Sequence, residues 1–291
     1  MQLQYAARAG DFVAKSDFDI SSEYARNARL KPAFLVGLPV AAVAASWGLS
    51  ASVLLGLVSG PLAAAGLTYL FAHLSRDSGQ KKQEKLFLSW GGKPSIRKLR
   101  HRDTTLNPHT RARYHQKAAE LLGKAMPTPA EEAADPAGAD FLYEAYCNLL
   151  LERTRDTKIH RLLFEELISY GFRRNLYGMK SIAVLLASLC TAVESVSLYS
   201  AFRSTHQVET GKAIFLALSL FLLLCWLFAI TPSWVKRAAD SYAERLLAAS
   251  ENLGSVSGRA AGTKDPNPKP KGSRRRSNTT NDPAPAGGSG S

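Results

Sequence analysis

Long uncharged stretches constrain this chain more than any other feature of its sequence. Residues 32–75 and 213–235 contain no Asp, Glu, Lys or Arg, and between Lys180 and Arg203 the only charged residue is Glu194. A helix rises about 1.5 Å per residue, so each of the two later stretches can cross a hydrocarbon core about 30 Å thick. The first stretch is long enough for two crossings. The sequence therefore predicts an all-α integral membrane protein with two transmembrane hairpins, four helices in all.

The predicted spans are about 33–49, 53–74, 181–202 and 213–231, with a tight turn at 48–52. The chain then divides into an N-terminal cytoplasmic helix (1–31), transmembrane hairpin 1 (32–75), a basic cytoplasmic helical domain (76–177), transmembrane hairpin 2 (178–232), an amphipathic cytoplasmic helix (233–253) and a disordered basic tail (254–291). Acidic residues interrupt the first thirty positions, which is not the pattern of a cleavable signal peptide.

Small residues recur at every fourth position in the first hairpin. Gly37, Ala41 and Ala45 follow this spacing, and so do Gly56 and Gly60. Such spacing places small side chains on one helix face and lets two backbones approach closely in lipid. Because this hairpin is richer in Ala and Gly than in large apolar residues, a soluble helical hairpin is the alternative for this part.

The distribution of basic residues predicts the orientation. Residues 75–115 hold eleven Lys or Arg against three Asp or Glu, and residues 259–276 add seven more Lys or Arg. The turn at 48–52 has no basic residue, and the connection between the later spans has only Arg203 and Lys212. Basic residues favour the cytoplasmic side. We expect a multi-pass protein of the cell inner membrane with both termini and the middle domain in the cytoplasm.

Within the middle domain, breakers and apolar periodicity predict several short helices. Gly91, Gly92 and Pro94 mark a turn, and Ser95 is the expected cap of a short helix that ends near residue 100. Thr110 is the expected start of the next helix. The proline-rich and acidic segment 127–140 reads as a loop, and helices are expected at about 141–150, 157–170 and 234–253.

Glu194 is the first candidate for a functional group. An acid inside a span costs roughly 2.5–3.5 kcal/mol on insertion scales, so it should face a protein interior or water. Hydroxyls lie nearby on the same predicted helix, so a polar stripe is expected to line a pore through Glu194, Thr191, Ser188 and Ser195. The alternative is that Glu194 lies near the outer membrane surface and pairs with Arg203.

A basic cluster in the middle domain is the second candidate. Arginine presents a planar fork of donors that suits phosphate groups. The expected ligand-binding residues are Arg97, Arg100, His101, Arg102, Arg111 and Arg113. Their ligand would be a nucleotide, a nucleic acid strand or an anionic lipid headgroup. The alternative is that these residues only keep the domain on the cytoplasmic side.

No constellation of an enzyme is present. His101-Arg102-Asp103 followed by Asn107 resembles a kinase catalytic loop, but the Asn is one residue too close and no glycine-rich loop accompanies it. The three cysteines and six histidines follow no metal-binding spacing. We therefore expect neither catalysis nor a cofactor.

Residues 157–253 combine an approach helix with Tyr-Gly-Phe-Arg-Arg at 170–174, a short-looped apolar hairpin and an exit helix with Ala-Asp-Ser-Tyr-Ala-Glu at 239–244. This layout resembles the small membrane effectors of bacterial anti-phage systems that act beside nucleotidyltransferases, including a two-span class associated with nucleotide second messengers. The resemblance implies a homo-oligomeric pore that harms the host cell, a nucleotide or oligonucleotide regulator and a nucleotidyltransferase partner. Such effectors commonly have two spans rather than four, and no site residue is carried over.

The leading hypothesis is an oligomeric membrane channel or permeabilising effector gated by a phosphate-bearing ligand at the basic domain. The competing hypothesis is a membrane-anchored scaffold or adaptor whose basic domain binds anionic lipid, nucleic acid or a protein partner. The two differ in what they require of the polar stripe, because a scaffold needs no file of hydroxyls that ends at an acid.

Overall fold

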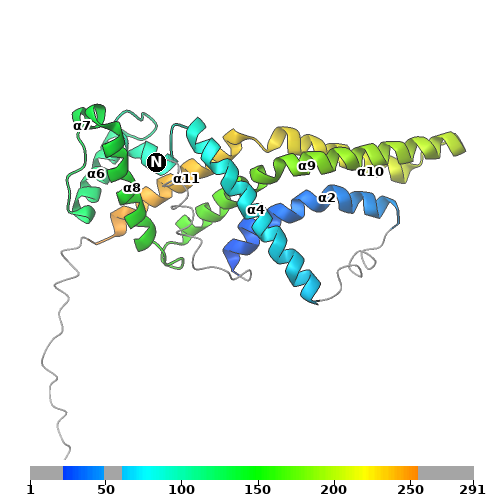
Figure 1. Ribbon diagram of the computed structural model, residues 1–291, viewed down its shortest axis with the longest axis horizontal. Coiled ribbons are helices and arrows are strands. Elements are labelled where there is room, and N and C mark those ends of the chain that lie inside the picture. Colours follow the sequence, from blue (N-terminus) through cyan, green and yellow to red (C-terminus); the bar gives the residue numbers. More distant parts are fainter. Residues whose placement is uncertain (1–21, 49–60, 255–291) are drawn as a thin grey trace, which may run out of the picture. The chain divides into compact units, whose positions relative to one another are not determined.

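The computed structural model describes residues 22–48 and 61–254, and every regular element in these ranges is a helix (Figure 1). The predicted all-α class is therefore confirmed for this part of the chain. The elements are η1 (Ala25–Leu30), α2 (Lys31–Ser46), α4 (Pro61–Ser89), α5 (Pro94–Leu99), α6 (Pro108–Leu122), α7 (Pro129–Ala134), α8 (Pro136–Arg153), α9 (Arg161–Thr205), α10 (Thr210–Leu224), η2 (Cys225–Ala229), α11 (Pro232–Ala249) and η3 (Ser250–Asn252).

Three of the described helices are long and apolar enough to cross a membrane: Ala25–Ser46, Arg161–Thr205 and Thr210–Ala229. They cover, to within two or three residues at one end, three of the four predicted spans and indicate a membrane protein. Large apolar side chains stay exposed on them, among them Phe34 at 63% and Phe221 at 60%. Exposed apolar surface on this scale suits contact with lipid or with other protein. The remaining predicted span, 53–74, begins outside the described residues and ends within α4.

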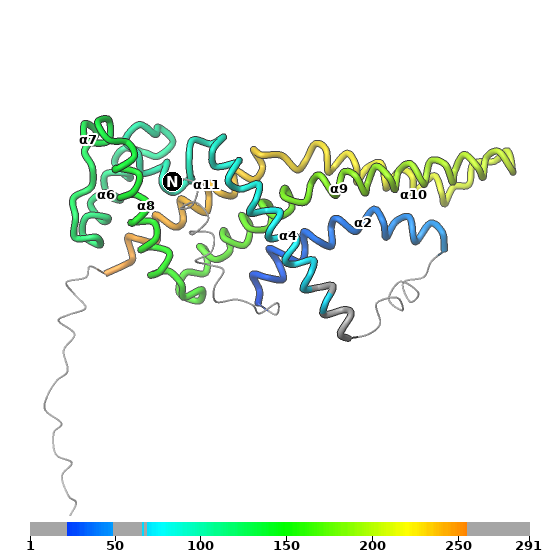
Figure 2. Tube along the Cα trace, in the orientation of Figure 1, coloured from blue at the N-terminus to red at the C-terminus, as the bar shows by residue number. Residues whose placement is uncertain are grey.

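Helix α9 is one continuous helix of 45 residues, where the sequence predicts an approach helix, a lead-in and a span. It ends at His206, whose left-handed backbone (φ 54°) reverses the chain into α10. Helices α2, α4, α10 and α11 all pack against α9, and α4 crosses it (Figure 2). Helix α9 thus positions these four helices, whereas α8 packs against α11 and the shorter helices α5, α6 and α7.

Proline begins six of the described helices (α4, α5, α6, α7, α8 and α11) because its missing N–H needs no partner in a first turn. One result corrects the predicted loop at 127–140: residues 129–134 form α7, whose first turn is held by a capping box between Thr128 and Glu131. The expected starts at Ser95 and Thr110 are also wrong by two or three residues. Prolines at 94 and 108 begin those helices instead, and Asn107 caps the second one.

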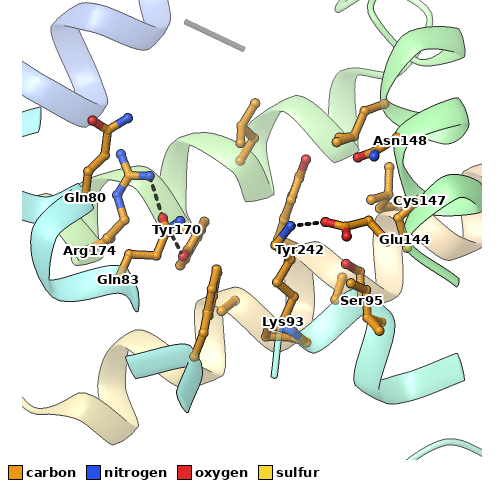
Figure 3. A pocket seen from close by; sticks show the side chains of 18 of the residues that line it. Gln80, Gln83, Lys93, Ser95, Glu144, Cys147, Asn148, Tyr170, Arg174 and Tyr242 are labelled. Atoms are coloured by element: carbon orange, nitrogen blue, oxygen red, sulfur yellow. Dashed lines mark hydrogen bonds and ion pairs between the residues drawn. The ribbon is translucent and has the colours of Figure 1, made fainter. Parts of the chain in front are cut away.

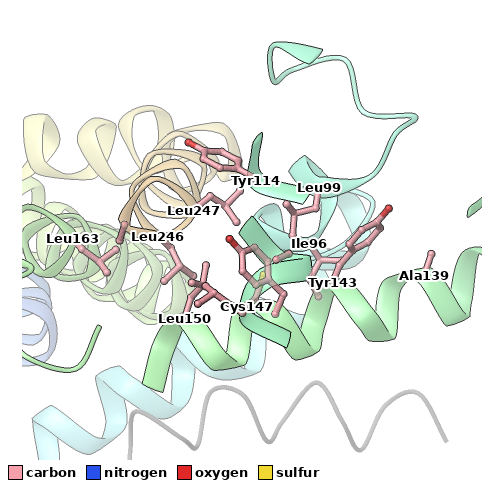
Figure 4. Packing of buried hydrophobic residues seen from close by; sticks show 14 residues of the cluster. Ile96, Leu99, Tyr114, Ala139, Tyr143, Cys147, Leu150, Leu163, Leu246 and Leu247 are labelled. Carbon is pink, nitrogen blue, oxygen red and sulfur yellow. The ribbon is translucent and has the colours of Figure 1, made fainter. Parts of the chain in front are cut away.

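The largest apolar core joins segments that are far apart in the chain. Tyr143, Tyr146 and Leu150 of α8 are fully buried, and they pack with Leu246 and Leu247 of α11 (Figure 4). Helices α5 and α6 complete this cluster. A second cluster lies among the apolar helices. It contains residues of α2 and α9, three of them alanines, and Trp226 of η2 packs against them. A third joins α4, α9 and α11.

Candidate functional site

Glu194 lies inside the packing of the apolar helices. The residue has no exposed surface, and the Ser46 hydroxyl at the end of α2 donates a hydrogen bond to its Oε1 over 2.5 Å. Its second carboxylate oxygen, Oε2, is buried without a hydrogen-bond partner among the described residues. No ion pair joins Glu194 to Arg203 in the described chain. Glu194 is thus an acid covered by the neighbouring helix α2.

The hydroxyls of the predicted stripe are placed differently from the acid. Ser188 and Ser195 are exposed, and Thr191 is half-buried between them and Glu194. The Thr191 hydroxyl donates to the Ala187 carbonyl over 2.8 Å, and the Ser195 hydroxyl to the Thr191 carbonyl over 2.7 Å. In this single chain the acid faces α2 while the serines face outward. Ser46 was not predicted as a partner of Glu194, because the two residues are 148 positions apart in the chain.

The six residues of the predicted ligand cluster each have partners inside the chain. Arg100 donates two hydrogen bonds, of 2.7 and 2.6 Å, to the Asp140 carboxylate, and it also donates one to the Gly91 carbonyl. Arg97 pairs with Asp103 at 3.2 Å and with Asp240 of α11 at 3.1 Å. These pairs fasten α5 to α8 and α11.

The remaining members of the predicted ligand cluster also have partners inside the chain. Arg111 donates to backbone carbonyls, including that of Arg100 at 3.3 Å, and Arg113 pairs with Glu251 at 3.0 Å. His101 Nε2 is 2.8 Å from the Pro127 carbonyl, and the His101 backbone N–H donates to Glu132. Arg102 lies 4.0 Å from Glu132. A phosphate at this cluster would have to compete with these internal contacts.

Glu132 shows how tightly the cluster is built. Burial alone raises the pKa of its carboxyl, but hydrogen bonds from the His101 backbone, the Tyr143 hydroxyl and the Arg102 backbone outweigh this and hold the pKa below 4.5. Nearby, burial holds the pKa of His115 below its ordinary value, against the pull of a hydrogen bond with the Leu99 carbonyl. The cluster is a satisfied polar network.

A cavity of about 140 Å³ lies where α5, α8 and α11 meet α4 and α9. Six segments contribute to its walls: the chain at Tyr24–Arg29, α4, the start of α5, α8, α9 and α11. Figure 3 shows Gln83 between Arg174 and Tyr170, with Lys93 and Glu144 on another wall. It is the candidate functional site, because it joins residues of opposite ends of the chain beside the apolar helices.

The cavity is strongly basic. Four cations line it (Arg29, Arg76, Lys93 and Arg174) against a single carboxylate, Glu144, which pairs with Lys93. Arg174 is 9% exposed. Its Nη1 donates to Gln83 Oε1 over 2.8 Å and its Nε to Asn175 Oδ1 over 3.1 Å. Among the described residues no carboxylate pairs with this buried guanidinium.

Aromatic rings form the remaining walls. The rings of Tyr170 and Tyr242 are nearly parallel, at 9°, with centroids 6.2 Å apart, and the Tyr170 hydroxyl donates to Gln83 over 3.0 Å. Burial raises the pKa of the Cys147 thiol to about 12, so it stays protonated at neutral pH and is no nucleophile. The lining thus combines cationic side chains with aromatic and apolar surface.

Tyr170, Arg174 and Tyr242 stand in separate sequence motifs, and no pattern in the sequence predicts that they meet. No site predicted from the sequence included Arg29 or Arg76. The cavity takes two to four residues from each of six segments, so no local pattern marks it.

No protein-family model, curated protein sequence or solved structure matches this chain. Within residues 22–48 and 61–254 no group of three or more His, Cys, Asp or Glu is arranged to hold a metal ion. The candidate site therefore rests on its own geometry and chemistry.

Proposed function

We propose that this chain is a multi-pass protein of the cell inner membrane that works as an oligomeric channel or permeabilising effector, gated by a phosphate-bearing ligand on its cytoplasmic side. Residues 53–74 supply the fourth span, and the basic residues around α5 and α6 keep the middle domain and both termini in the cytoplasm. A role in anti-phage defence follows only from the resemblance of residues 157–253.

The continuity of α9 carries this proposal. The helix reaches from Tyr170 and Arg174, in the wall of the basic cavity, to Glu194 among the apolar helices. Twenty residues separate Arg174 from Glu194, a distance of about 30 Å at helical rise. A ligand that shifts or turns α9 at the cavity therefore acts directly on the segment that holds the acid.

The described arrangement corresponds to a closed state in this proposal. Ser46 of α2 covers Glu194, so opening requires α2 to move away or α9 to turn. The carboxylate then joins Ser188, Thr191 and Ser195, which lie within about a third of the helix circumference at 100° per residue. A ring of such acids in an oligomer favours cations. The ligand can gate the pore only by binding the open state more tightly.

A scaffold is the second candidate, and the ion-paired arginines favour it. Arg97, Arg100 and Arg113 already bind acids of the same chain, and Glu194 is covered. In a scaffold these features only hold the fold together, and the exposed apolar faces only anchor it in lipid.

Ion flux separates the two candidates. Full-length protein in liposomes is tested for cation flux without ligand and with ATP or pyrophosphate, comparing wild type with Glu194→Ala and Glu209→Ala. Glu209 is the matched control because it lies in the connection before α10 and pairs there with Lys212. We expect ligand-dependent flux that Glu194→Ala changes and Glu209→Ala leaves alone. Absence of cation flux under every condition would eliminate the channel hypothesis and leave the scaffold hypothesis.

A further inference from the structure

We infer that the cavity between α4, α9 and α11, rather than the predicted arginine cluster, binds the phosphate group of the ligand. Arg76 and Arg174 are the residues that contact this phosphate. The gating role of this ligand rests on the proposed function, whereas the binding site itself does not.

The buried charge of Arg174 is the first argument. A buried guanidinium is stable only when a counter-charge or a full set of hydrogen bonds replaces water. Arg174 has the amide oxygens of Gln83 and Asn175 and the face of the Tyr170 ring, 5.8 Å from its Cζ, but no carboxylate within the described chain. An anion in the cavity would complete its environment.

Arg76 supplies the second argument. It lines the same cavity from α4, is half-buried, and has no hydrogen bond or ion pair within the described residues. Arginine forks bind phosphate through paired N–H donors, so two arginines around one cavity suit a single phosphate group. By contrast, the forks of Arg97 and Arg100 are already taken by Asp240 and Asp140.

The size and walls of the cavity limit the ligand. A cavity of about 150 Å³ in another protein holds one benzene molecule, so the 140 Å³ here holds one phosphate group with little else. The rest of the ligand must extend past the rings of Tyr170 and Tyr242 toward the opening. Those rings suit a planar or apolar group beside the phosphate.

Two sources of such a phosphate are compatible with the position of the cavity. Arg76 is two residues beyond the predicted end of the second span, and Arg174 precedes the predicted third span by about 10 Å at helical rise. An anionic lipid headgroup can therefore reach the cavity from the membrane, and a phosphate ester can reach it from the cytoplasm. Both present the same chemistry to the two arginines.

Binding to full-length protein in nanodiscs tests the inference. ATP and pyrophosphate are titrated by calorimetry in phosphatidylcholine discs, and retained phosphatidylglycerol is measured by native mass spectrometry after reconstitution in mixed discs. The variants are Arg76→Gln, Arg174→Gln and the matched control Arg245→Gln, which removes an exposed arginine of α11 outside the cavity. Circular dichroism checks folding, and Arg76→Gln carries the test if the buried Arg174 variant does not fold.

Loss of one charged hydrogen-bonding partner should weaken binding about tenfold or more. Weaker binding of ATP or pyrophosphate in Arg76→Gln, with Arg245→Gln like wild type, assigns the site to a soluble phosphate ester. Loss of retained phosphatidylglycerol in the same variant assigns it to a lipid headgroup. Equal behaviour of Arg76→Gln and Arg245→Gln toward all three probes overturns the inference.

These results are independent of pore activity. Binding that depends on Arg76 without any ion flux leaves the site standing and removes the channel. Flux that responds to a ligand equally in wild type and Arg76→Gln leaves the channel standing and removes the site.

Discussion

Gly178 of α9 and Gly79 of α4 lie backbone against backbone: a Cβ added at Gly178 would be 2.6 Å from the Cα of Gly79. Asn175 lies at the same crossing and donates its side-chain amide to the Ala28 carbonyl over 2.7 Å. The crossing therefore fixes α4 and α9 to each other and to η1, one turn away from the cavity residue Arg174.

Alanine at Gly178 should destabilise the protein by about 1–3 kcal/mol or more, because the added methyl group meets backbone that cannot move aside without separating the helices. Thermal unfolding in detergent, followed by circular dichroism, measures the loss. Gly37→Ala is the control, since nothing lies within 4 Å of a Cβ there and its effect should stay within about 0.5 kcal/mol. Equal melting temperatures for both variants would contradict the close crossing.

Lysine at Arg100 should lower the free energy of unfolding by about 1–3 kcal/mol. Its guanidinium bridges Asp140 and the Gly91 carbonyl from a side chain that is 13% exposed, and an ammonium cannot reproduce that fork. Arg113→Lys, at an exposed pair with Glu251, should cost less than about 1 kcal/mol. Chemical unfolding of the two variants compares them directly, and similar losses would argue against a structural role for the cluster.

Acid should destabilise the packing of α5 to α8 through Glu132. Its folded pKa lies below the ordinary 4.5, so on acidification the unfolded chain takes up the proton first. The stability that this carboxylate contributes is present above about pH 4.5 and is lost as the pH falls through the folded pKa. Melting temperatures of wild type and Glu132→Gln measured over the acid range should therefore converge. Tyr143→Phe, which removes one donor, should show a smaller pH dependence than wild type; parallel profiles would refute the prediction.

Alanine at Ser46 should raise the basal cation flux of the reconstituted protein, because it removes the hydrogen bond that holds α2 over the buried Glu194. The same variant should melt at a lower temperature, since a buried acceptor loses its partner. Ser219→Ala is the matched control: its hydroxyl is buried in α10 without a partner among the described residues, so its loss should be neutral or slightly stabilising. Equal basal cation flux in the two variants would show that the Ser46 hydrogen bond does not keep the pore closed.

Apolar length and turn chemistry predicted much of the fold. The uncharged stretches around Val36, Ala187 and Leu220 lie in the three membrane-length helices, and the turn at 90–92 is present. Where one helix stops was less predictable. Gly171 and Gly178 fall inside the continuous α9, because neighbouring helices pack against both and offset the weak helix propensity of glycine.

Gly56 and Gly60 lie outside the described residues, so the expected close approach of backbones in the first hairpin stays a prediction. In the described chain Gly37 is exposed, and the close helix crossing lies at Gly79 instead. Spacing alone does not say which small residue meets which helix, because that depends on the angle at which the helices cross.

The candidate site was the least predictable part. A dense run of arginines reads locally as a phosphate site, but its partners, such as Asp140 and Asp240, come from other helices. Arg174 and Arg76 are inconspicuous in sequence, and only the packing of α4 on α9 places both around one cavity. Pairings of this kind are set by tertiary structure and leave no local signal.

The cytoplasmic core contains Tyr146 and Leu150 from before the second hairpin and Leu246 and Leu247 from after it. During synthesis this core stays incomplete until the residues of α9 and α10 have left the ribosome. Under the proposed function, this hairpin would enter the bilayer before the core beside it is complete. A nascent chain that ends at Ala229 would contain α8 with its apolar face exposed. Chaperones and proteases act on exposed apolar surface of this kind.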